Sequence, residues 1–289
     1  MQLIGGLDTW PACDQLIWRA ELPTISPDLM FWFALATKMA ITALFVTVAT
    51  IIAEKLGAVV GALVATLPVS AGPVYVFLAL DHGPTFISAS AVASLAMNAA
   101  TAVFVTAYVR MAQRRSLWIS VSLAFIAWLA TTLVLASVRW TALSASVVNL
   151  SVFALCLWIV KPFRLVPMPP TTRPWNDFVV RAGMVTLLVG AVVTLSFRIG
   201  PAGSGVLAVF PVIYASIMVI LHRRVGGPAT AAVLANAVPG LAGFGIALLI
   251  LHLSAVSFGS ALALVAALGV SVAWNAGLYF LFEGKTDIV

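Results

Sequence analysis

Two stretches of similar sequence set the fold of this chain: GAVVGALVATLPV at 57–69 and GPAGSGVLAVFPV at 200–212, which begins 143 residues later. The same offset places Lys38 over Arg181, and one inserted residue brings Pro84 over Pro228. An Ala/Ser-rich segment after Pro84 then matches an Ala/Asn-rich segment after Pro228. The sequence therefore predicts two related units joined by a linker.

The chain is far too apolar for a soluble protein. Hydrophobic residues make up 63% of the 289 positions and charged residues 8%, whereas soluble domains carry roughly 25% charged residues. Apolar runs of about 20 residues, the length that crosses a bilayer, follow one another closely and leave no room for a soluble domain. We predict an all-α polytopic membrane protein with nine transmembrane helices at 31–53, 58–80, 86–110, 117–138, 140–160, 178–197, 203–222, 228–252 and 257–282.

The cationic residues predict the orientation, because short cytoplasmic loops collect Lys and Arg. Nine helices place three cations on the N-terminal side and ten on the opposite side. We therefore expect an outside N-terminus and a cytoplasmic C-terminus. The net charge of +6 suits anionic membrane lipids as partners and requires no nucleic acid. The ten are Lys55, Arg110, Arg114, Arg115, Lys161, Arg164, Arg173, Arg223, Arg224 and Lys285, against Arg19, Arg139 and Arg198.

Corresponding helices are five apart, so the two units enter the membrane in opposite directions. The predicted division is an outer arm (1–30), a first unit (31–138), a linker helix and loop (139–174), a second unit (175–283) and a tail (284–289). Inverted repeats with Gly/Pro-interrupted helices are typical of secondary transporters. The alternative is an old duplication of a non-transporting four-helix protein, and a homodimer is as compatible with the small packing residues as a monomer.

The second unit resembles the GlpM family of small bacterial four-helix membrane proteins. The likeness lies in a basic residue opening the first helix, Arg181, and a Gly-x-x-x-x-Phe-Pro segment, here Gly205 to Pro211, followed by HRRVGG from His222. The first unit departs from it with Leu67-Pro68. The resemblance implies a bacterial inner-membrane protein associated with exopolysaccharide production, and it implies no substrate.

Charges inside the spans are the first candidates for a solute site, because they are costly there. Arg181 can pair with Asp177 at i,i+4 or reach the headgroups on its long stem. Lys38 has Ala34 and Thr42 at helical spacing and no acid, which makes it the stronger candidate for contact with a solute.

Prolines and amides supply the remaining candidates. Pro68 and Pro73 interrupt the second helix, exposing small polar groups such as Thr66 and Ser70, and each proline frees a backbone carbonyl. Pro211 and Tyr214 are the counterparts in the second unit. Simple packing kinks are the alternative role of these prolines.

Two asparagines inside the predicted spans, Asn98 and Asn236, complete the predicted substrate-binding set. Their alternative role is hydrogen bonding between helices. Asn236 precedes Pro239 and Gly240, so we also expect the eighth helix to be interrupted.

The absence of chemical motifs narrows the function. All nine acidic residues fall at or beyond the predicted span ends, which disfavours a proton relay. No zinc spacing and no paired carboxylates occur, so we predict neither an enzyme nor a cofactor or metal. The expected function is a secondary transporter or facilitator of a small anionic or zwitterionic solute. The alternatives are a non-transporting accessory factor in envelope polysaccharide or lipid biogenesis, and a lipid flippase.

Overall fold

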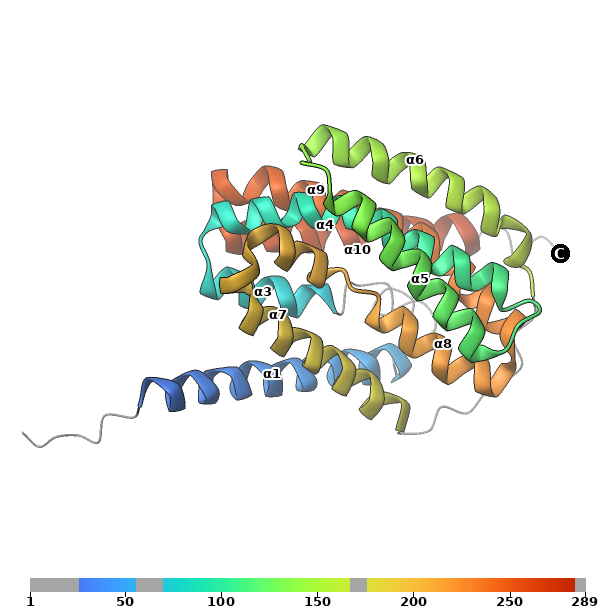
Figure 1. Cartoon of the computed structure of the whole chain (residues 1–289), viewed down its shortest axis with the longest axis horizontal. Coiled ribbons are helices and arrows are strands. Elements are labelled where there is room, and N and C mark those ends of the chain that lie inside the picture. Colours follow the sequence, from blue (N-terminus) through green and yellow to red (C-terminus); the bar gives the residue numbers. More distant parts are fainter. Residues whose placement is uncertain (1–25, 56–69, 167–175, 284–289) are drawn as a thin grey trace, which may run out of the picture.

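The computed structural model describes residues 26–55, 70–166 and 176–283, and every regular element in these ranges is helical (Figure 1). This confirms the predicted all-α class. The outer arm and the tail lie largely outside the described residues, as does the first half of the helix predicted at 58–80. The elements are α1 (Pro27–Lys55), α3 (Ala71–Asp81), α4 (Pro84–Met111), α5 (Leu117–Ala136), α6 (Ala142–Val160), η2 (Lys161–Phe163), α7 (Asn176–Ala208), α8 (Val212–Val225), α9 (Gly227–Phe258) and α10 (Ser260–Glu283).

The described helices make this a multi-pass membrane protein. Seven helical stretches are long and apolar enough to cross a bilayer, and α3 is a shorter apolar helix. One of the seven, Val179–Val225, runs for 47 residues, which is about twice the length of one crossing. It contains two of the predicted helices, 178–197 and 203–222. The total of nine spans stays a prediction.

Helix α4 forms the centre of the bundle and packs against α5, α6, α7 and α9. Its membrane-spanning window is 83% buried, against 17% for the windows of α1 and α10. Alanines such as Ala96, Ala99 and Ala100 are fully buried on α4, because small side chains let the α9 backbone approach closely. In Figure 1 the two helices lie together, while α1 lies at the edge of the bundle beside α7.

The Gly/Pro-rich stretch that begins the second repeat bends the chain sharply. Gly200 has φ +67°, a left-handed conformation that a glycine adopts at no steric cost. Pro201 starts the next helical segment, which ends at Ala208. Pro211 then closes a three-residue turn in which the Val212 N–H donates to the Phe210 carbonyl at 2.7 Å. The predicted interruption at Pro211 is thus observed as a break between α7 and α8.

The broken segment is held against α4 and α5. Ser94 and Thr101 of α4 donate side-chain hydrogen bonds to the Gly205 carbonyl at 2.7 Å and the Val209 carbonyl at 3.0 Å. The Phe210 ring packs edge-to-face on Trp128 of α5, with ring centroids 4.9 Å apart. The carbonyls at the break therefore bond to protein at this depth, as membrane burial requires.

The expected interruption of the eighth helix is wrong, because α9 runs continuously from Gly227 to Phe258 through Pro239. Trp274 of α10 donates its indole N–H to the Pro239 carbonyl at 2.9 Å. Gly243 leaves room for that indole, since a Cβ there would lie 2.0 Å from it. The proline removes the N–H that would donate to the Ala235 carbonyl, and the Trp274 bond holds α10 against α9 beside this position.

Gly205 should be required for this packing. A Cβ on Gly205 would lie 2.3 Å from the Ser90 backbone oxygen of α4, which a side-chain movement cannot relieve. We expect Gly205→Ala to lower the free energy of unfolding by about 1–3 kcal/mol, measured by thermal melting of the purified protein in detergent.

The matched control is Gly183→Ala on the same helix, where a Cβ would meet no atom within 4 Å. Because alanine favours a helix over glycine, this control should be neutral or slightly stabilising. Equal melting temperatures for Gly205→Ala and the wild type would refute the close approach of α7 to α4.

Candidate functional site

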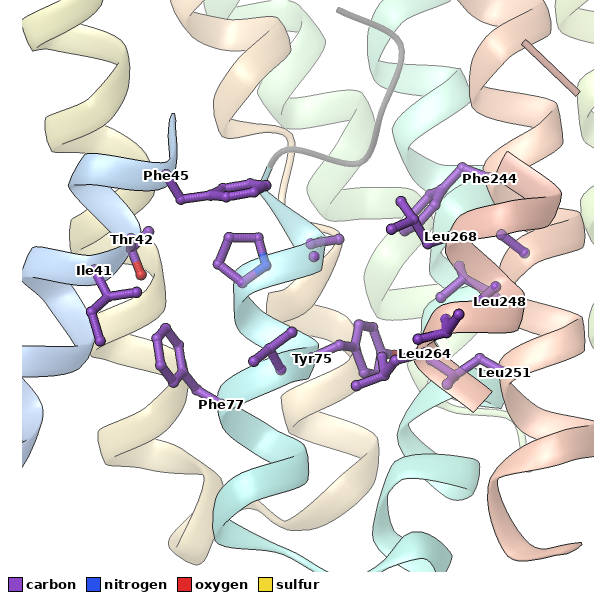
Figure 2. A pocket seen from close by; sticks show the side chains of 17 residues that line it. Ile41, Thr42, Phe45, Tyr75, Phe77, Phe244, Leu248, Leu251, Leu264 and Leu268 are labelled. Carbon is purple, nitrogen blue, oxygen red and sulfur yellow. The ribbon is translucent and has the colours of Figure 1, made fainter. Parts of the chain in front are cut away.

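A groove of about 440 Å³ lies between α1, α3, α9 and α10 (Figure 2). Seventeen side chains line it, and among them only Thr42 and Tyr75 carry a polar group. Thr42 donates its hydroxyl to the Lys38 carbonyl at 2.8 Å. The Tyr75 hydroxyl is directed toward α4, where it lies 2.6 Å from the Ser94 hydroxyl. The surface that the groove presents to a ligand is therefore apolar.

The groove exists because α1 joins the bundle mainly through α7. Helices α3 and α10 contact each other on its far side, and α9 forms its floor. On α1, Ile41 and Phe45 line the groove and are about half exposed. Their exposed faces mean that the groove opens on the outer surface of the bundle, where lipid chains would lie.

A partly buried ion pair stands one helical turn beyond the groove. Lys38 Nζ bonds to Asp81 Oδ1, and both side chains are less than one-fifth exposed. Lys38 precedes the lining residue Thr42 by four positions, and Asp81 follows the lining residue Phe77 by four. The Lys38 ammonium also lies 5.9 Å from the centroid of the Phe77 ring. The second Asp81 oxygen, Oδ2, is buried and accepts no hydrogen bond from the described residues.

A layer of polar contacts continues from this pair across the same end of the bundle, which we call the His82 end. His82 Nε2 lies 2.9 Å from the Ser196 hydroxyl of α7, and its ring stacks on Phe86 at 3.8 Å. Burial lowers the pKa of His82, although Asp81 opposes this effect. Ser88 of α4 lies 2.8 Å from Nδ1 of His252 on α9. These contacts tie α3, α4, α7 and α9 together beside the ion pair.

Three of the predicted site residues belong to this region. Lys38 forms the ion pair, Pro73 lines the groove, and Ser70 directly precedes α3. Thr66 and Pro68 lie outside the described residues. The interpretation of Lys38 as a cation without an acidic neighbour needs correction, because Asp81 reaches it from a different helix.

The other five predicted residues lie away from the groove lining. Asn98 is fully buried and donates its amide to the Leu241 carbonyl of α9 at 3.1 Å. Asn236 is exposed and donates to the Arg164 carbonyl at 3.1 Å. Pro211 and Tyr214 stand at the start of α8, and Arg181 lies half-buried in the first part of α7. Their role in substrate binding stays a prediction.

Asp81 is the functional candidate that sequence reasoning passed over. Helical spacing within one helix shows no acid beside Lys38. The predicted topology nevertheless places the beginning of the first helix and the end of the second at the same side of the membrane. Lys38 and Asp81 therefore lie toward the same side of the membrane, and a cation in a span requires a counter-ion.

Among the residues that the structure describes, no group of three or more His, Cys, Asp or Glu side chains is arranged to hold a metal ion. Comparisons with protein-family models, with curated proteins and with solved structures give no match. The resemblance to the GlpM family stays a prediction, and function has to be argued from the geometry itself.

The Lys38–Asp81 pair should show strong energetic coupling. Removing one partner leaves the other charge partly buried and unpaired, which costs 3–5 kcal/mol in a fully buried pair and, we expect, about 1–3 kcal/mol here because both side chains are partly exposed. Lys38→Met and Asp81→Asn should each lower the melting temperature, and the double variant should recover most of the loss.

A double-mutant cycle on the melting curves measures this coupling. Arg198→Met, at an exposed arginine of α7, is the control for loss of a cation and should be neutral. Additive losses in the double variant would contradict the pairing.

Proposed function

We propose that this protein is a lipid transporter, which takes an amphipathic lipid into the groove between α1, α3, α9 and α10 and carries its headgroup across the membrane. The observation that supports this most directly is an apolar groove, open at the bundle surface, that ends one turn from the Lys38–Asp81 pair. A hydrocarbon chain suits the groove and a charged headgroup suits the pair.

The same geometry argues against the small polar solute that the sequence led us to expect. A polar solute in the groove would lose hydrogen bonds to water and find none in the wall, at a cost of several kcal/mol for each group. The amides of Asn98 and Asn149 at the centre are already bonded to carbonyls of α9 and α4. A lipid tail exchanges one apolar surrounding for another and avoids this cost.

The ion pair suits a zwitterionic headgroup. A phosphate can pair with the Lys38 ammonium, and a headgroup amine can pair with Asp81, whose Oδ2 has no partner among the described residues. The Phe77 ring beneath the ammonium offers a surface for the first methylene groups of the lipid.

Transport by two inverted units of four helices belongs to this proposal, together with nine spans and a cytoplasmic C-terminus in a bacterial inner membrane. Contacts near the centre and at both ends of α4 support the repeat. Asn98 bonds to Leu241, which directly precedes Ala242, the counterpart of Asn98 at the offset of 144 residues that follows Pro84 and Pro228. Tyr108 and His252 correspond after one insertion. Tyr108 bonds to His222 at one end of the bundle, and His252 to Ser88 at the other.

Two features would allow the units to move. The backbone changes direction at Gly200 and again at Phe210–Pro211, so the segment between them is bounded by a hinge at each end. Helix α1 has few contacts with α3, and a shift of α1 with α7 would widen or close the groove. Such hinges at element ends are typical of alternating access.

A non-transporting accessory factor in envelope polysaccharide or lipid biogenesis is the second candidate. The observation that favours it is the dense centre, where α4 and α9 pack through alanines and glycines. Such a protein would bind lipid in the groove without moving the headgroup, so binding and translocation have to be measured separately.

The groove can be filled without disturbing the fold. Gly72 lines it, and a Cβ at this position would meet no atom within 4 Å. We expect Gly72→Trp to abolish most translocation because the indole occupies the space of the lipid chain. The measurement is the rate at which a phosphatidylethanolamine with a fluorescent acyl chain becomes accessible to an external quencher in proteoliposomes, compared with protein-free vesicles.

The matched control is Gly277→Trp on α10, at an exposed position outside the groove with equal free space. It should translocate like the wild type. Wild-type rates equal to those of protein-free vesicles, combined with photo-crosslinking of the lipid that Gly72→Trp prevents, would support the accessory role. Absence of both signals would overturn lipid handling altogether.

A further inference from the structure

A second pocket, of about 360 Å³, lies where the last turn of α4 meets the end of α6 and η2. Arg110 of α4 and Lys161 of η2 supply its two charges, and Trp158, Pro162 and Phe163 supply much of its apolar wall. This pocket shares no lining residue with the groove. It lies toward the opposite end of α4 from the His82 contacts.

The charges in this pocket are uncompensated within the described part of the chain. No acidic residue lines it, and neither Arg110 nor Lys161 has an ion-pair partner among the described residues. Two cations that converge on one cavity repel each other, and an anion between them removes that repulsion. The pocket is therefore electrostatically suited to a group with negative charge, such as a phosphate.

The surroundings indicate that this phosphate comes from a lipid. Trp158 is 73% exposed, and Leu155, one turn earlier on α6, is 56% exposed. Indole rings favour the headgroup region of a bilayer, which places the two cations at headgroup depth. A dissolved anion would gain nothing from this apolar strip, whereas the chains of a lipid would lie along it.

We infer that the pocket of Arg110, Lys161 and Trp158 is a binding site for the phosphate headgroup of an anionic phospholipid, separate from the proposed transport groove. Basic pockets between transmembrane helices are a known type of lipid-headgroup site. The occupant would bridge α4 to the end of α6 through its phosphate. It would thereby stabilise the contact of the central helix with the segment that links the two units.

Native mass spectrometry of the detergent-purified protein, with equal amounts of phosphatidylglycerol and phosphatidylcholine added, tests this site. We expect the wild type to retain phosphatidylglycerol preferentially. The double variant Arg110→Gln/Lys161→Gln should weaken that binding roughly 25-fold, at about fivefold for each interfacial cation. The matched control Arg114→Gln/Arg115→Gln removes two exposed charges from the adjacent loop, outside the pocket, and should keep the preference.

If both double variants lost phosphatidylglycerol binding equally, diffuse surface charge would explain the binding and the proposed site would be refuted. Competition by millimolar inorganic phosphate as strong as that by phosphatidylglycerol would overturn the lipid assignment. Melting curves of all variants without lipid control for folding, and Lys161→Arg should retain binding because it keeps the charge. Since Gly72→Trp leaves this pocket intact, its failure to translocate would be distinguishable from loss of the headgroup site.

Discussion

The close approach of α4 and α9 is the constraint on which the rest of the structure depends. Lipid chains are as apolar as leucine, so burial alone does not hold two helices together in a bilayer, and packing and hydrogen bonds must do so. Buried alanines on α4 and Gly245 on α9 allow the backbones to meet, and a Cβ on Gly245 would lie 3.1 Å from the Asn98 amide nitrogen of α4. The Asn98 and Asn149 amides then bond across α4, α6 and α9.

That packing also determines where a ligand can bind. Hydroxyls of α4 that might have lined a polar path instead hold the broken segment between Gly200 and Pro211, through Ser94 and Thr101. These two hydroxyls are therefore engaged by backbone carbonyls of the broken segment. Among the described residues, a groove lies at the periphery, where α1 packs on α7 and α10 lies across the groove from α1. The apolar wall of this groove suits a hydrocarbon chain better than a polar solute.

Some of this was predictable from sequence, and the exceptions have physical causes. Charge and apolar length indicated the spans, and the match of Pro211 to Pro68 indicated the helix break, because both depend on local chemistry. Helix α9 continues through Pro239, where it is contacted by Trp274, which is 35 residues away and on another helix. Whether Asn98 binds a solute or a neighbouring carbonyl depends likewise on which helix faces it. Local pattern contains neither answer. The predicted topology puts Lys38 and Asp81 toward the same side of the membrane, but we did not pair them on the sequence alone.

The ion pair also restricts which headgroups can be accommodated. A ligand with a single negative charge that separated Lys38 from Asp81 would leave the carboxylate partly buried and without its cation, and an unpaired buried charge is costly. A zwitterion can give each partner a new opposite charge, so the separation costs least. An uncharged headgroup would leave the pair closed and bind only through its chain. The Lys38–Asp81 contact thus favours zwitterionic lipids in the groove, whereas the uncompensated cations of Arg110 and Lys161 favour anionic ones at the other end of α4.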